Sequence, residues 1–197
     1  MIKLFNKWDT SAIKVEDKGL AGYICLKPII MPKTGGRNVK VMFHKSRNHI
    51  VERLIAKLMV PGHKGKKHRL SSGHCTGKVV DKYYVVKKAF EIIEEKTKKN
   101  PIEVFVKAIE NAAPREEITA IEYGGARYPK AVECSPQRRV DVALRMMVQG
   151  AFAKSFNKKQ KIEQTLSDEI LKAYNMDQNS NAIGKKLELE RQADASR

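Results

Sequence analysis

Basic side chains able to bind phosphate are concentrated between Lys33 and Lys78, where twelve Lys and Arg residues stand against one acid, Glu52. Many of them fall in Gly- and Ser-containing stretches, where side chains and backbone N–H groups can follow an irregular phosphate path. A solvated helix face, the alternative, usually interleaves charges of both signs. We therefore predict contact with RNA. The expected binding residues in this stretch are Lys33, Arg37, Lys40, Lys45, Arg47, Lys64, Lys66, Lys67, Arg69 and Lys78.

Candidate metal ligands are crowded into the same stretch: His63, His68, His74 and Cys75. Common zinc fingers need two ligand pairs, each separated by about two to five residues, and this spacing does not provide them. Histidines in a basic loop more often stack on bases or stay solvated than bind metal. We expect neither a metal nor a cofactor; zinc is the alternative, and the role of this loop is left open.

No enzyme motif accompanies the positive charge. The pair Gly77-Lys78 resembles the end of a phosphate-binding loop, but Ser72 stands where the first glycine belongs and Val79 where Ser or Thr belongs. Neither HExxH nor GxSxG occurs, and the carboxylates lie mostly on predicted helix faces beside basic residues. We expect a binding protein, with no catalytic residue and no small-molecule substrate.

The whole chain carries a net charge of +17 over 197 residues and has a pI near 9.8, which a polyanionic partner would offset. Its 42% hydrophobic content suits a globular protein, and no apolar run approaches the ~20 residues of a membrane-spanning helix. Three widely separated cysteines, Cys25, Cys75 and Cys134, and a lysine-interrupted start indicate a reduced, intracellular protein without a secretory signal. We expect no association with membranes.

The elements that must position the basic residues divide the chain into an irregular N-terminal extension, residues 1–45, and a helical RNA-binding domain, residues 46–197. Proline and a Gly-Gly pair interrupt the short apolar pieces of the first part. Ser46 is a suitable N-cap for the first helix of the second part, which ends before Pro61. The apolar residues of this helix recur at helical spacing: Ile50, Val51, Leu54, Ile55, Leu58 and Met59.

Helical spacing predicts five further helices, over roughly 83–99, 101–113, 136–151, 162–174 and 182–193. Asn100-Pro101 and Ser135-Pro136 are start signals, because each places a capping side chain before a proline at the first helical position. Three arginines lie off the apolar stripe of the helix that follows Ser135-Pro136 and join the expected RNA-binding set. They are Arg138, Arg139 and Arg145.

Two short extended runs flank Gly124-Gly125 and predict a β-hairpin near 117–134. Tyr123 and Tyr128 lie close to the turn together with Arg127, where the rings either stack on bases or pack across the strands. The predicted fold class is therefore mainly α. It is a single bundle of about six helices with a protruding β-hairpin and an irregular N-terminal extension.

A family resemblance is carried by several of these segments. They are Ile50-Val51-Glu52-Arg53-Leu54, residues 100–113 with Pro114-Arg115-Glu116, Gly124-Gly125, and Val132-Glu133-Cys134-Ser135-Pro136-Gln137-Arg138-Arg139-Val140. Together they resemble the family of universal small-ribosomal-subunit protein number seven. The opening Lys3-Leu4-Phe5, Glu188-Leu189-Glu190-Arg191 and the terminal Arg197 are similar to its archaeal and eukaryotic branch, with the archaeal side favoured. The likeness covers nearly the whole chain.

The resemblance implies a structural constituent of the small ribosomal subunit, located with it in the cytoplasm. It implies binding to the 3′ major domain of small-subunit rRNA, nucleation of head assembly and contacts with neighbouring small-subunit proteins. Ser46-Arg47, Gly65-Lys66-Lys67 and Arg138-Arg139 match positions that the family uses on RNA. The hairpin is implied to reach toward the messenger exit path and exit-site tRNA. The residues of its tip are Gly124, Gly125, Arg127, Tyr128 and Lys130.

Some alternatives stay open at this point. Either Lys66-Lys67 or Lys78 occupies the family's basic site, because the loop between the first two helices is long. The first arm of the hairpin carries Glu116, Glu117 and Glu122, so we expect RNA contact at the tip and after Pro136 rather than along this arm. From charge and capped helices alone, a DNA-compacting or regulatory protein fits as well, and a nucleic-acid enzyme is a remote third.

Overall fold

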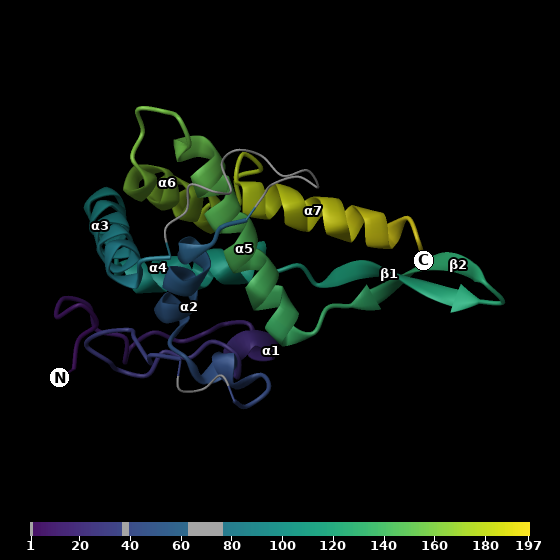
Figure 1. The fold of residues 1–197 in the computed structure, drawn as a ribbon, viewed down its shortest axis with the longest axis horizontal. Coiled ribbons are helices and arrows are strands. Elements are labelled where there is room, and N and C mark those ends of the chain that lie inside the picture. Colours follow the sequence, from purple (N-terminus) through teal and green to yellow (C-terminus); the bar gives the residue numbers. More distant parts are fainter. Residues whose placement is uncertain (1, 37–39, 63–76) are drawn as a thin grey trace.

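The computed structural model describes residues 2–36, 40–62 and 77–197, which form a mainly helical fold with one hairpin (Figure 1). The expected fold class is confirmed. Seven α-helices lie in the described ranges, against about six expected, because α1 is an additional single turn. The helices are α1 (Lys18–Ala21), α2 (Ile50–Met59), α3 (Val79–Thr97), α4 (Pro101–Ala112), α5 (Pro136–Ser155), α6 (Ile162–Tyr174) and α7 (Asn181–Asp194), with a short 3₁₀ helix η1 (His44–Arg47) and strands β1 (Glu116–Tyr123) and β2 (Ala126–Glu133).

Some of the residues singled out in the sequence lie outside the described ranges. They are Arg37, His63, Lys64, Gly65, Lys66, Lys67, His68, Arg69, Ser72, His74 and Cys75. Within the described ranges, no helix is long and apolar enough to cross a membrane.

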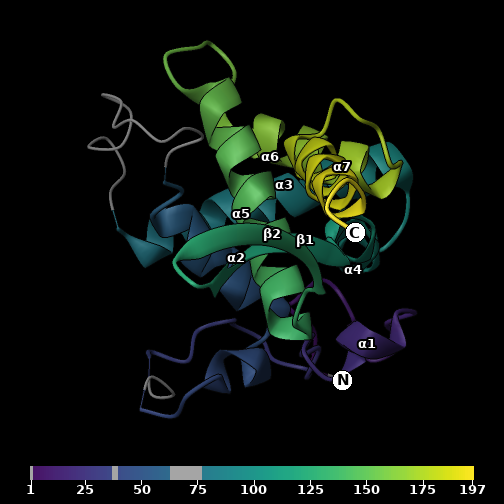
Figure 2. The same ribbon diagram turned by 90° about the vertical axis from the view of Figure 1, so that its right-hand side faces the viewer.

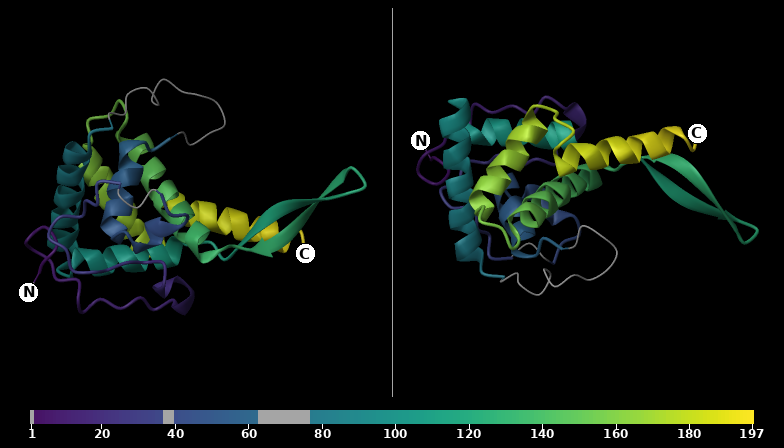
Figure 3. Two further views of the ribbon diagram at one scale, coloured as in Figure 1. Left: turned by 60° about the horizontal axis from the view of Figure 1, so that its bottom comes forward. Right: turned by 90° about the horizontal axis from the view of Figure 1, so that it is seen from above.

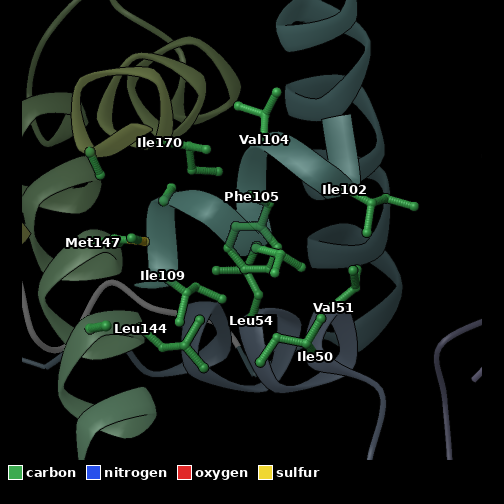
Figure 4. Close-up of a cluster of buried hydrophobic side chains, with 14 of the residues drawn as sticks. Ile50, Val51, Leu54, Ile102, Val104, Phe105, Ile109, Leu144, Met147 and Ile170 are labelled. Carbon is green, nitrogen blue, oxygen red and sulfur yellow. The ribbon is translucent and has the colours of Figure 1, made fainter. Parts of the chain in front are cut away.

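Helix α4 lies at the centre of the core, in contact with α3, α5 and α6 (Figure 4). Phe105 is fully buried on this helix and points among side chains from α2, such as Leu54, and from α5 and α6. A buried side chain of this size contributes about 3 kcal/mol to stability through the apolar area it removes from water. The core therefore fixes the α2 and α5 surfaces relative to each other, and these surfaces carry the basic residues discussed below.

The predicted start of α4 is confirmed. Asn100 is the N-cap and its Oδ1 accepts a hydrogen bond from the backbone N–H of Ile102 at 3.1 Å, while Pro101 takes the first helical position. The Asn100 amide also donates to the carbonyl of Asp9 at 2.7 Å, so the cap ties the N-terminal segment to the core. Helix α5 likewise begins at Pro136, although the Ser135 side chain makes no capping hydrogen bond.

The predicted start of the first long helix is wrong. Ser46 lies in η1, where its Oγ donates to the carbonyl of Phe43 at 2.7 Å, and α2 begins only at Ile50. The N-cap is His49, whose Nδ1 accepts the N–H of Val51 at 3.2 Å. The reason lies in tertiary structure: the Ile50 N–H donates to the carbonyl of Cys25 at 3.0 Å, and this pairing holds residues 48–49 in an extended conformation.

The cap of α2 gives the fold a specific dependence on pH. Burial lowers the pKa of His49 to about 4, from 6.5 in an unfolded chain. Between about pH 6.5 and pH 4 the unfolded state therefore binds a proton at His49 and the folded state does not. The free energy of unfolding consequently falls as the pH drops through this range. We expect this effect of His49 to make the free energy of unfolding about 2 kcal/mol lower at pH 5 than at pH 7.

Urea unfolding at pH 7 and pH 5 checks this expectation. In the variant His49→Asn the side chain still caps the helix but does not titrate in this range, so its stability should change by about 2 kcal/mol less between the two pH values. Equal pH dependence in both proteins would show that His49 is not the titrating group.

The N-terminal segment has little regular structure, but its apolar side chains belong to the core. Leu4, Phe5 and Trp8 are buried. The rings of Phe5 and Trp8 pack against Phe90 of α3, with the Trp8 ring edge-on at a centroid distance of 5.9 Å. The Trp8 indole N–H also donates to Glu94 at 3.0 Å. The segment thus folds over the helical domain, because these side chains find apolar partners there.

The hairpin projects away from the helices (Figures 1 and 3). Its two-residue turn consists of Gly124 and Gly125, with φ values of +56° and +83°. Both values lie in the left-handed region that a type I′ turn requires and that glycine adopts without strain. At its base the hairpin has α7 on one side and the N-terminal end of α5 on the other (Figures 1 and 2). Helix α7 packs against β1 there.

Candidate nucleic-acid interface

A groove of about 600 Å³ lies between the segment around Lys33 and helix α2, with Asp141 of α5 in its wall. Its lining combines backbone of a Gly-Gly pair, some apolar surface of α2, and four cationic side chains against two carboxylates. The cations are Lys33, Lys45, Arg53 and Lys57, and the carboxylates are Glu52 and Asp141. A groove with this excess of positive charge is suited to an anionic ligand.

Asp141 holds two of these cations. Its Oδ1 accepts a hydrogen bond from Arg53 Nη2 at 3.0 Å, and its Oδ2 is paired with Lys45 Nζ. Arg53 is only 6% exposed and also donates to the carbonyl of Tyr23 at 2.9 Å, so it is a structural part of the groove wall. Burial alone would raise the pKa of Asp141, but the hydrogen bonds from Lys45 and Arg53 hold that pKa below its ordinary value.

Lys57 lies in the same place without an ion pair in the described ranges. Burial lowers the pKa of its ammonium; Asp141 raises it, whereas Arg145, Lys45 and Arg53 lower it further. We call Lys45, Arg53, Lys57 and Arg145 the α2 cation cluster. One carboxylate compensates only part of the charge of this cluster, and a phosphate group placed among its members would relieve their mutual repulsion.

Several of the predicted binding residues are available at the surface. Each is exposed and has no ion pair within the described part of the chain: Lys33, Lys40, Arg47, Lys78 and Arg145. Lys33 and Lys45 line the groove and Arg145 is close enough to influence Lys57, so the fold brings residues from three separate segments to one face. Lys78 is the N-cap residue of α3 and directly precedes Val79, which lines the same groove.

The two neighbouring arginines of α5 are both engaged within the protein. Arg139 is 12% exposed, pairs with Asp17 at 2.8 Å and donates to the carbonyl of Pro114 at 3.1 Å. Arg138 is about half exposed and pairs with Glu117 at 2.6 Å. Arg139 therefore fastens the N-terminal segment to α5, while Arg138 keeps part of its guanidinium open to a ligand.

The acidic arm of the hairpin is neutralised by arginines that the sequence pattern did not connect with it. Glu116 accepts a hydrogen bond from the terminal Arg197 at 2.6 Å, and Glu117 accepts one from Arg138. Near the turn, Glu122 lies 3.5 Å from Arg127. The charge of this arm is thus compensated before any ligand arrives, which removes much of the conflict between these carboxylates and a phosphate backbone.

The hairpin tip presents aromatic and cationic surface to solvent. Tyr123 is 72% exposed and Tyr128 is 58% exposed. The register places Tyr123 opposite Ala126 and Tyr128 opposite Ile121, so the two rings are not directly paired across the strands. This arrangement favours the interpretation of the tyrosines as surface available for stacking.

Arg53 and Lys57 line the groove of the candidate interface, although the sequence reasoning counted them as basic without assigning them to a binding site. A signal was present for Arg53, because it follows Ile50 by three residues and so lies on the apolar face of α2. A charged residue at such a position needs a buried partner. That partner, Asp141, is 88 residues away in the sequence, and only the tertiary fold identifies it.

The described residues meet the requirements of neither a nucleophilic cysteine nor a metal site. Burial raises the pKa of Cys134 to about 11, so its thiol is protonated at neutral pH and is a poor nucleophile. Within the described ranges no three His, Cys, Asp or Glu side chains are grouped closely enough to hold a metal. The loop with His63, His68, His74 and Cys75 lies outside these ranges.

A family model described as ribosomal protein S7p/S5e matches residues 22–197. A small ribosomal subunit protein uS7 of Nanoarchaeum equitans is 56% identical over 196 residues, covering 100% of this chain and 99% of the relative. The uS7 proteins of Archaeoglobus fulgidus and Methanothrix thermoacetophila are 47% and 45% identical, over 98% and 100% of this chain and 94% and 100% of the relatives.

Proposed function

The chain belongs to the ribosomal protein S7p/S5e family, and on this premise we propose that it binds the 3′ major domain of small-subunit rRNA and nucleates assembly of the subunit head. The family match and the identity to these archaeal relatives confirm the resemblance drawn from the sequence. As in those relatives, the chain's place is the small ribosomal subunit. It is a structural constituent of that subunit rather than an enzyme. Neighbouring small-subunit proteins are its further partners.

The observation that carries the proposal is the α2 cation cluster beside a groove. Lys57 and Arg145 have no ion pair in the described residues, and they stand next to two cations that share a single aspartate. RNA phosphates entering this face would replace the missing counter-charges and release bound ions. Because α2 and α5 are fixed by the core, RNA helices bound to both would be held at one relative angle. Fixing the angle between RNA helices is how binding of the protein would nucleate folding of an RNA junction.

The hairpin supports the second part of the proposal, a position near the messenger exit path and exit-site tRNA. Its tip, Gly124 to Lys130, stands clear of the helical body (Figure 3). The exposed tyrosines and Arg127 offer stacking and charge, which suit single-stranded RNA without strong sequence preference. The ion pairs of Arg138 with Glu117 and of Arg197 with Glu116 reduce the repulsion that the base of the hairpin would offer to a phosphate backbone.

Removing two cations from the cluster tests the rRNA-binding proposal. We expect Lys57→Gln combined with Arg145→Gln to weaken binding to the isolated rRNA junction at least tenfold at low salt. The slope of log affinity against log salt should fall by about 1 to 2, because one or two fewer phosphate contacts release fewer counterions. Filter binding or anisotropy across a salt series measures both quantities.

The matched control removes the same charge from Lys158 and Lys159, which are exposed in the loop after α5. If the control pair weakens binding as much as the cluster pair, the groove is not the RNA site. Competition with duplex DNA of equal length separates the proposal from an architectural DNA-binding role, since equal affinity for both would favour the latter. Co-sedimentation with small subunits after a high-salt wash tests stable incorporation.

A further inference from the structure

Phe43 is an exposed aromatic residue held in a strained backbone conformation. Its side chain is 66% exposed although a phenylalanine gains considerably from burial. Its φ of +59° lies in the left-handed region, where residues other than glycine and asparagine are rare because Cβ approaches the backbone. Met176 combines the same two features, with a φ of +56° and 63% exposure, so what sets Phe43 apart is its aromatic ring and the cations around it.

The local structure maintains this conformation. The Phe43 carbonyl accepts hydrogen bonds from Ser46 Oγ at 2.7 Å and from the Ser46 N–H at 3.2 Å, so Phe43 acts as the N-cap residue of η1. The turn into η1 thus fixes the direction of the backbone at Phe43 and leaves the ring in solvent. Because the backbone is already held, only side-chain freedom remains to be lost when a flat partner stacks on the ring.

The surroundings of Phe43 indicate what that partner is. Lys40 and Arg47 are exposed on either side of it in the sequence and have no ion pair in the described residues, whereas the exposed Lys45 pairs with Asp141. No acidic residue occurs between positions 33 and 51. A protein partner would have to match the exposed ring with apolar surface and the cations with several acidic side chains at once. An RNA base offers an apolar π-face and brings phosphates for the cations, so both features of the site are matched by one ligand.

We propose that Phe43 is a stacking platform for an unpaired RNA base, clamped by phosphate contacts to the lysines and arginine around it. The inference rests on the proposed function, because it assumes that this face meets RNA. It adds a contact of different chemistry to the α2 cation cluster, since stacking is insensitive to salt whereas the phosphate contacts are not.

Substitutions at Phe43 separate stacking from charge and from folding. Phe43→Leu keeps an apolar side chain but has no π-face, and it should weaken binding to the rRNA junction about tenfold while leaving the salt slope unchanged. Phe43→Tyr should bind as the unchanged protein does. Phe43→Gly should weaken binding at least as much as Phe43→Leu, yet leave the free protein at least as stable, because glycine adopts the left-handed conformation without strain.

A direct readout comes from the variant Phe43→Trp, whose fluorescence should be quenched on adding RNA, beyond any change that the unchanged protein shows through Trp8. Full affinity of Phe43→Leu, or the lack of this extra quenching while Phe43→Trp binds RNA, would overturn the inference and leave this patch to a protein partner. A clear loss of stability in Phe43→Gly would also overturn it, because the ring would then serve the fold. If the unchanged protein itself shows no salt-dependent RNA binding, the proposed function fails instead.

Discussion

Replacing Gly150 with alanine is expected to destabilise the protein by about 3 kcal/mol or more. Gly150 lies in α5 where it faces α6 and α7, and a Cβ at this position would overlap Oε1 of Glu169 and come within 2.7 Å of the Cβ of Asn181. Glu169 is fully buried and cannot move aside without loss. Its Oε1 accepts the N–H of Asn181 at 2.7 Å, at the start of α7, and its Oε2 accepts from Lys154 at 2.8 Å.

A small residue at position 150 thus allows a buried carboxylate to join three helices. The expected loss combines overpacking with the breaking of a buried charged hydrogen bond, and each of these effects alone is large. Gly184→Ala in α7 is the matched control, because the nearest atom to its new Cβ is 3.6 Å away. There the exchange should be neutral or slightly stabilising, as expected for alanine in a helix.

Urea unfolding of the two variants measures the difference. Equal stability of Gly150→Ala and Gly184→Ala would contradict the contact with Glu169. A double-mutant cycle with Glu169→Ala assigns the cause. If the carboxylate is what the new methyl group displaces, Gly150→Ala should cost clearly less in the Glu169→Ala background than in the unchanged protein.

Helix positions were predictable from the sequence wherever local chemistry decides them. Asn100 and Pro101 begin α4 because the cap and the fixed φ of proline act within a few residues. The Gly124-Gly125 turn was predictable for the same reason. The start of α2 was not, because Ser46 is an equally good cap by type, and the choice of His49 depends on a hydrogen bond to the distant carbonyl of Cys25.

The candidate site also combines features that the sequence shows with features that only the fold shows. The excess of positive charge and its position along the chain can be read from the sequence, so a phosphate-binding face could be predicted without the structure. The partners of each arginine are properties of the fold: Arg139 pairs with Asp17, 122 residues away, and Arg197 with Glu116. Sequence separation hides such pairs, and they decide which cations remain available to a ligand. Arg139, predicted to contact RNA, is the residue for which this matters most.

Asp141→Asn is expected to have opposite effects on stability and on RNA binding. In the free protein Arg53 would lose its charged partner while staying buried, and we expect a loss of about 3 kcal/mol. Lys45, which lines the groove, would lose its ion pair, and one of the two carboxylates of the groove would lose its negative charge. At a separation near 6 Å this charge opposes a phosphate by about 1 kcal/mol or more, so affinity for RNA should rise about threefold or more at low salt.

Asp168→Asn is the control, because it removes the same charge from an exposed pair with Lys96 and should change stability by less than about 1 kcal/mol. Unfolding measurements and RNA titrations on both variants give the two effects separately. Weaker RNA binding by Asp141→Asn at a temperature where it remains folded would mean that Asp141 positions the cations for the ligand. Tighter binding would mean that in the free protein the Asp141 carboxylate occupies the role of a phosphate. It would neutralise the α2 cation cluster and hold it together until RNA phosphates bind the same cations.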